Sequence, residues 1–188
     1  VYSFSSGTLT ELTGCRKDHG SIINSIAWSP NGTYLAVGGY SGTDGYGIRV
    51  YTFNGTTLTG GDTASTARDH GGIVNSVAWH VNSNYLAIGG YGGTDGYEVR
   101  VYGWSGSALS GGDTTSTAKD HGATVNSVHW HPDGTYLALG GNGGTGGYEV
   151  RVYSWSEGAL SESPVDSKDH GNTIYSVHWN PDGDYLAA

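Results

Sequence analysis

Histidines that each follow an aspartate are the residues of this chain best suited to chemistry. The tripeptide Asp-His-Gly occurs four times, and its acidic and imidazole members are Asp18, His19, Asp69, His70, Asp120, His121, Asp169 and His170. In nucleophilic enzymes an aspartate orients the histidine that acts as general base. A catalytic site normally occurs once, whereas this pair returns at intervals of 51, 51 and 49 residues. We therefore predict that these pairs make structural hydrogen bonds at turns, and we predict no catalytic residue.

A second group of histidines would suit a metal ion. His129 and His131 are two residues apart in a segment with strand periodicity, so their imidazoles would project from one face and could converge. His80 aligns with His131 in another repeat, and His178 aligns with His129. These histidines follow the register of the repeat, and no Cys or Glu lies near them in sequence. We therefore predict no metal site and no cofactor.

Motifs for other chemistries are missing from the sequence. There is no Gly-x-Ser-x-Gly nucleophile elbow, and Cys15 aligns with Thr66 and Thr117, so it occupies a variable position of the repeat. The glycine-rich segments do not lead into predicted helices, which is the context that a phosphate-binding loop requires. We predict a protein that is not an enzyme.

The composition of the chain limits the classes of partner that it can bind. The chain has 188 residues and a net charge of −9, and an acidic chain repels the phosphates of nucleic acids. No stretch of about 18 apolar residues occurs, so we expect no membrane partner. A single cysteine excludes internal disulfides and leaves both reducing and oxidising compartments open. The 34 glycines with 14 tyrosines and 6 tryptophans favour a β protein with many tight turns.

A tandem repeat of about fifty residues underlies all these motifs. After each Asp-His-Gly comes a related segment, which reads IINSIAWSPNGTYLA, IVNSVAWHVNSNYLA, TVNSVHWHPDGTYLA or TIYSVHWNPDGDYLA. Apolar and polar residues alternate with a period of two, and Asn-Gly or Asp-Gly in three of these segments predicts a tight turn. A third strand reads IRVYTF, VRVYGW or VRVYSW, and a weaker fourth follows. Each unit thus predicts four strands, a to d, and radial stacking of such sheets buries both faces.

The repeat resembles the WD40 family over essentially the whole chain. The resemblance rests on Asp-His-Gly before strand a, on Leu-Ala-x-Gly in strand b, and on the turns Ser29-Pro30-Asn31-Gly32, His131-Pro132-Asp133-Gly134 and Asn180-Pro181-Asp182-Gly183. It implies an all-β propeller of four-stranded antiparallel blades, with about four blades in this chain. It also implies a Trp–Ser–His–Asp hydrogen-bond tetrad, which is incomplete here. Tyrosines replace the Trp and aliphatic residues replace the Ser, at Tyr51, Tyr102, Tyr153, Val37, Ile88 and Leu139. The histidines could still pair with Asp44 or Asp95, but the third loop has Gly146 at that position.

Residues 1–188 are expected to form one repeat region of three complete blades, with a fourth blade divided between the two ends of the chain. WD40-type rings usually contain about seven or eight blades. Two explanations stay open. Either a homodimer completes a ring of eight blades, or the 188 residues are part of a longer repeat protein.

The loops between strands b and c form the expected binding face, together with the Asp-His-Gly turns. Tyrosine, glycine, aspartate and asparagine are typical of adaptable binding loops. The candidate ligand-binding residues are Tyr40, Asp44, Tyr46, Tyr91, Asp95, Tyr97, Asn142 and Tyr148. We expect a platform that binds a protein or peptide. The alternatives are a lectin-like propeller that binds glycans and a purely structural repeat assembly.

Overall fold

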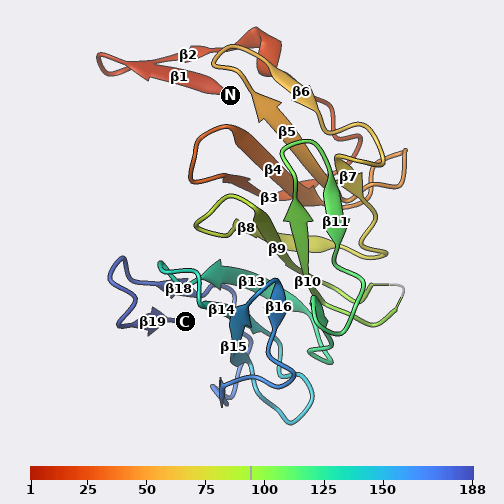
Figure 1. Ribbon diagram of the computed structural model, residues 1–188, viewed down its shortest axis with the longest axis vertical. Helices are drawn as coiled ribbons and strands as arrows, with labels where there is room; N and C mark the ends of the chain where they lie inside the picture. Colours follow the sequence, from red (N-terminus) through yellow and green to blue (C-terminus); the bar gives the residue numbers. More distant parts are fainter. Residues whose placement is uncertain (94) are drawn as a thin grey trace.

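A computed structural model describes residues 1–93 and 95–188 as an array of β-sheets. Three antiparallel sheets, which we call blades 1 to 3, lie side by side along an open arc (Figure 1). A hairpin of two strands lies at each end of this arc, β1–β2 near the N-terminus and β18–β19 at the C-terminus. The prediction of an all-β propeller with four-stranded antiparallel blades is confirmed.

Each blade runs through strands a, b and c in chain order. The fourth strand is split into two short pieces that both pair with strand c. Blade 1 comprises β3 (Ile23–Trp28), β4 (Tyr34–Gly39), β5 (Ile48–Phe53), β6 (Leu58–Gly60) and β7 (Ala67–Arg68). Blade 2 comprises β8 (Val74–Trp79), β9 (Tyr85–Gly90), β10 (Val99–Trp104), β11 (Leu109–Gly111) and β12 (Ala118–Lys119). Blade 3 comprises β13 (Val125–Trp130), β14 (Tyr136–Gly141), β15 (Val150–Ser156), β16 (Ala159–Leu160) and β17 (Asp166–Lys168).

The remaining elements are short. They are β1 (Tyr2–Ser5), β2 (Thr8–Glu11), the 3₁₀ helix η1 (Thr13–Cys15), β18 (His178–Trp179) and β19 (Leu186–Ala187). By repeat position, β1 and β2 correspond to strands c and d, whereas β18 and β19 correspond to strands a and b. In the part of the chain that the structure describes, no helix is long and apolar enough to span a membrane.

Strand b of each blade is a buried central strand, because it lies between strands a and c of its own sheet. Residues 35–39, 86–90 and 137–141 are all buried, which explains why strand b is continuously apolar. Glycine is required near its end, since a Cβ atom at Gly38 would lie 2.6 Å from the Val74 side chain of the next blade. Gly89 and Gly140 meet the next blade in the same way.

The junctions between blades repeat the same contacts. At the junction of blades 1 and 2, the indole nitrogen of Trp79 donates to the Ala27 carbonyl (3.1 Å), and the Val77 amide donates to the Ser25 hydroxyl (3.1 Å). Asn24 lies at a β-bulge and donates to the Val74 carbonyl (3.0 Å). The equivalent bonds between blades 2 and 3 come from Trp130, Val128 and Asn75. Each junction therefore combines apolar packing with three hydrogen bonds at fixed repeat positions.

Blade 1 has no such neighbour on its other side. We call this side the open flank and define it by Ile23, Ile26 and Trp28 on β3. Ile26 is 63% exposed, whereas Val77 at the same repeat position in blade 2 is 6% exposed.

Candidate functional site

A buried arginine organises the loop end of blade 1. The Arg49 side chain is 3% exposed, and all three nitrogens of its guanidinium donate hydrogen bonds. Nε donates to Nδ1 of His19 (2.9 Å), Nη1 donates to the Gly61 carbonyl (2.9 Å), and Nη2 binds both carboxylate oxygens of Asp44 (2.7 and 2.8 Å). The far ring nitrogen of His19 then lies 2.8 Å from the Tyr40 carbonyl. Arg49 therefore stands between the histidine and the aspartate that the WD40 pattern would pair directly.

Blade 2 repeats this cluster. Arg100 donates to His70 Nδ1 (3.2 Å) and to the Gly112 carbonyl (2.8 Å), and it forms an ion pair with Asp95. Burial, followed by the nearby Arg100 charge, lowers the pKa of His70 to about 4. His70 is therefore a neutral hydrogen-bond acceptor at neutral pH, which is the state that the guanidinium requires.

Blade 3 keeps the arginine but lacks the acid. Gly146 occupies the position of Asp44 and adopts a positive φ of 84°. Arg151 is buried and donates to the Thr145 carbonyl, while its Nε has no partner in the described structure. The three clusters therefore differ in how completely the arginine is satisfied.

The aspartates of the Asp-His-Gly motifs act on their own turns. Asp18, Asp69 and Asp169 each accept the backbone amide of the glycine two residues later, at 2.7–2.8 Å. At the third motif the acceptor is a glutamate and not the aspartate of the motif: Glu98 accepts the backbone amides of His121 (2.8 Å) and Gly122 (3.3 Å).

Sequence reasoning missed these glutamates. Glu149 plays the same part by accepting the His170 amide at 2.7 Å. The available signal was the recurrence of Glu directly before strand c, at Glu98 and Glu149, where the first unit has Gly47. His19, His70 and His121 are buried, whereas His170 is exposed at the end of the array.

The eight candidate ligand-binding residues fall into two groups. Asp44 and Asp95 are committed to the arginines, and the half-buried Tyr97 ring lies 5.7 Å from the Arg100 guanidinium. Tyr46, on the equivalent position of blade 1, is half-buried as well. The four members that are exposed at the loop end of the blades are Tyr40, Tyr91, Asn142 and Tyr148.

Three of these exposed residues form a row, which we call the loop row. Tyr40, Tyr91 and Asn142 each directly follow strand b of their blade. Their amides donate to the carbonyls of Ile22, Ile73 and Thr124 at 2.8–2.9 Å, just before strand a. The backbone of the loop row is therefore fixed while its side chains face solvent.

The histidines on strand a do not converge on one point. His131 pairs with Asp133 (2.6 Å) and contacts the Gly183 carbonyl (3.0 Å), whereas His129 stacks on His178 with ring centroids 3.7 Å apart. Burial, followed by the neighbouring His178, lowers the pKa of His129 to about 4. Among residues 1–93 and 95–188, no three His, Cys, Asp or Glu side chains lie close enough together to share a metal ion.

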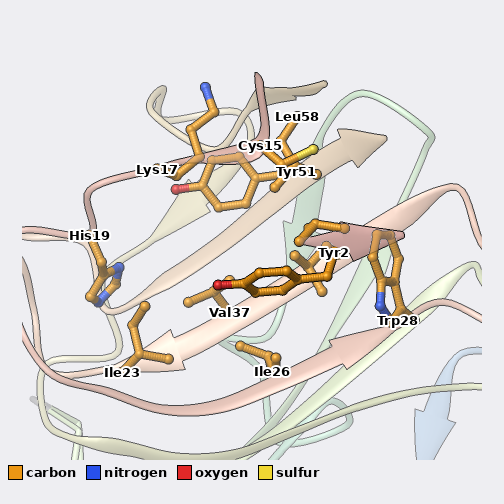
Figure 2. A pocket seen from close by; sticks show the side chains of 12 residues that line it. Tyr2, Cys15, Lys17, His19, Ile23, Ile26, Trp28, Val37, Tyr51 and Leu58 are labelled. Carbon is orange, nitrogen blue, oxygen red and sulfur yellow. The ribbon is translucent and has the colours of Figure 1, made fainter. Parts of the chain in front are cut away.

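The open flank carries an apolar cavity of about 490 Å³. It is bounded by β3, by β4 and by the first residues of the chain, and Figure 2 shows the Tyr2 ring between Tyr51 and Ile26. Lys17, His19 and Cys15 lie at its edge, and the Cys15 thiol is buried beside the Thr56 carbonyl (3.4 Å). Hydrocarbon dominates the lining, so the cavity suits packing against another apolar surface.

Comparison with protein families agrees with this architecture. Residues 10–45 match the WD domain, G-beta repeat, and residues 58–188 match the family of eukaryotic translation initiation factor eIF2A, a WD40-like propeller family. The chain belongs to this family of WD40-repeat β-propellers. WD40 domains generally act as scaffolds for protein interactions, and proteins of these two families are generally not enzymes.

A solved structure shares the fold of this WD40-repeat propeller. It is the crystal structure of a protein described as a 6-phosphogluconolactonase from Bacteroides uniformis, with a TM-score of 0.71 and 16% sequence identity. The match covers 98% of this chain and 55% of the other, so the chain spans about half the length of that protein. At this identity the likeness concerns the fold alone.

Proposed function

We propose that this propeller is a binding platform that takes a protein or peptide on its loop face. The observation that carries the proposal is the loop row, in which Tyr40, Tyr91 and Asn142 are exposed at the same place in three successive blades. Rigid strands that present two exposed tyrosines and an asparagine in a row provide contact area at low entropic cost. The arginine clusters beneath the row stiffen its base.

The distribution of charge favours a basic segment of the partner. Four of the eight basic residues are buried, namely Arg49, Arg100, Lys119 and Arg151. Only two of the seventeen acidic residues, Glu98 and Glu149, are buried. The surface is therefore more acidic than the net charge of −9 indicates, and complementary charge speeds association and selects partners.

The experiment is selection of peptides from a random display library on the folded chain, followed by affinity measurements on variants. We expect enriched peptides to be basic and the double variant Tyr40→Ala, Tyr91→Ala to weaken their binding at least tenfold. Val81→Ala is the control, because Val81 is 47% exposed on the a–b turn, at the opposite end of the strands. Equal weakening by the control, or enrichment that ignores the loop row, would count against the proposal.

A glycan is the second candidate ligand, and a groove between blades 2 and 3 favours it. This groove has a volume of about 560 Å³ and presents the half-buried Tyr97 ring with Asp120 and Glu162, while Tyr153 and Lys119 are buried in its wall. Rings together with mixed donors and acceptors suit stacking on a sugar and recognition of its hydroxyls. Titration with simple sugars tests this candidate, and no binding at millimolar concentration removes it.

We also propose that the fourth blade is divided between the two ends of the chain, and that the ring is completed either by a second copy, which gives eight blades, or by further repeats of a longer protein. The half-blade hairpins β1–β2 and β18–β19 support this arrangement, because they supply different halves of the repeat. The mass of the particle in solution tests the ring.

A further inference from the structure

A buried guanidinium in blade 3 lacks the acidic partners that its counterparts have in blades 1 and 2. The side chains of Arg49 and Arg100 are each 3% exposed, and each binds an aspartate of its own b–c loop. A second carboxylate, that of Asp62 or Asp113, contacts Nη1 of the same arginine at 3.4 or 3.0 Å. Each of these two buried charges is therefore neutralised by acids of its own blade.

The repeat unit of Arg151 has lost both acids. Gly146 stands at the position of the first aspartate, and Pro164 stands at the position of the second. Arg151 is 6% exposed, and the group to which its Nη2 donates is the neutral carbonyl of Thr145. Among the residues that the structure describes, its Nε has no partner and no Asp or Glu forms an ion pair with it. A buried charge without a counter-charge is strongly unfavourable.

The glutamate beside this arginine does not replace the missing acids. Glu149 lies two residues before Arg151 and accepts the backbone amide of His170 at 2.7 Å. Its counterpart Glu98 likewise binds the amides of a turn, and the arginine of that blade still has its own aspartate. The glutamate and the aspartate therefore have separate roles in this repeat.

The missing acids belong to a segment that is present. In blades 1 and 2 all the hydrogen-bond and ion-pair partners of the arginine lie within residues 19–62 or 70–113. The corresponding segment of blade 3 is 121–164, and the structure describes all of it. The difference therefore comes from substitutions inside this repeat unit.

We infer that blade 3 binds the carboxylate group of a ligand at Arg151, where the other two blades use their own aspartates. The repeat provides the precedent, because Nη2 of Arg49 lies 2.7 and 2.8 Å from the two carboxylate oxygens of Asp44. Solvent reaches this position, since the side chains of Asp44 and Asp95 are 41% and 43% exposed although both arginines are buried. In blade 3 the same loop position is an exposed glycine.

This site goes beyond the proposed function, because it adds one cationic point to an acidic surface. The ligand class is a carboxylate, carried either by an Asp or Glu side chain of a partner or by a small free acid. Asn142 and Tyr148 belong to the same b–c loop and are exposed, so they offer an amide and an aromatic ring to the rest of the ligand.

The test is a nuclear magnetic resonance titration of the arginine Nε–H signals of the full chain at pH 7. Sodium acetate replaces sodium chloride at constant ionic strength. We expect the Arg151 signal to shift and to saturate. Arg49 and Arg100 are internal controls, because each already holds an aspartate, and their signals should not shift. No shift at Arg151, or equal shifts at all three arginines, would overturn the inference.

Two variants of one glycine sharpen the test. Gly146→Asp restores the acid of the other blades and should weaken acetate binding at Arg151 at least tenfold. Gly146→Asn has nearly the same shape without the charge and should keep the binding. Both replacements meet the same positive φ of 84°, so their backbone strain is matched. Equal binding by the two variants would overturn the inference, and if either fails to fold, the titration of the unmodified chain still decides.

A second probe distinguishes the two sources of the carboxylate. N-acetyl-aspartate methylamide represents an aspartate side chain within a polypeptide. Binding at least as tight as that of acetate assigns the site to a protein partner, whereas binding of acetate alone assigns it to a small free acid. The signals of Arg151 do not depend on peptide binding at the loop row, so this inference and the proposed function fail separately.

Discussion

The junction of blades 1 and 2 and the open flank of blade 1 present almost the same residues in opposite surroundings. Trp79 is 7% exposed at the junction, whereas Trp28 is 42% exposed on the flank. The indole nitrogen of Trp79 donates to the Ala27 carbonyl of the preceding blade. Trp28 has no complete blade before it among the described residues, so an equivalent acceptor would have to come from another blade. Burial in this repeat is therefore set by the neighbouring blade and not by the residue's own strand.

The largest expected effect on stability comes from replacing Trp79 at the junction, and its matched comparison is the replacement of Trp28 on the open flank. Trp79→Ala should lower the free energy of unfolding by about 3–5 kcal/mol, because it leaves a cavity in a closed junction. Trp28→Ala should cost about 1–2 kcal/mol when the chain is monomeric, because much of the ring is already solvated. Denaturant unfolding at low chain concentration measures both. Equal losses would show that the flank is as closed as the junction.

The next prediction concerns the pH dependence of the unfolding free energy, to which the buried His70 of blade 2 contributes. The folded-state pKa of His70 is depressed from 6.5 to about 4, so its contribution to stability is fully present above pH 6.5. That contribution is lost as pH falls from 6.5 to about 4, and it amounts to roughly 3 kcal/mol. His70→Asn should flatten the dependence of the unfolding free energy on pH over this range, and Val81→Ala should not. An unchanged slope in the His70 variant would contradict the buried neutral imidazole.

A smaller effect separates the complete and incomplete arginine clusters. Arg100→Met should destabilise the chain by about 2–3 kcal/mol, since it leaves the Gly112 carbonyl and Nδ1 of the buried His70 without a donor and removes the ion pair with Asp95. Arg151→Met should cost about 1 kcal/mol, because Gly146 offers no carboxylate. Thermal unfolding of the two variants gives the order. A larger loss from the Arg151 variant would mean that the aspartate does not anchor the cluster.

The smallest effect concerns one hydrogen bond at a junction. Asn75→Ala removes the bond to the Val125 carbonyl and should cost about 1 kcal/mol. Tyr175 holds the same repeat position at the end of the array, where it is exposed, so Tyr175→Ala in the monomer should change stability by less than about 0.5 kcal/mol. Chemical denaturation resolves the difference, and a reversed order would contradict the assigned bond.

The strands that could be predicted from the sequence are those with local signals. The period of two and the tight turns place strands a and b, and IRVYTF and its relatives place strand c. The fourth strand has a weak signal because it is split into two pieces by the turn between Gly60 and Ala67.

The candidate site was harder to predict, since its contacts join distant segments. The bond from Arg49 to His19 spans 30 residues, and Glu98 reaches the turn of the following repeat. The exposure of Trp28 could not be predicted from its own segment, because IINSIAW and IVNSVAW are nearly the same sequence.

Amide hydrogen exchange tests the central comparison most directly, because it reports β3 and β8 in one sample. At low chain concentration we expect peptides from β8 (Val74–Trp79) to be protected and those from β3 (Ile23–Trp28) to exchange faster. Equal protection of the two strands at every concentration would contradict the account that a neighbouring blade determines burial in this repeat.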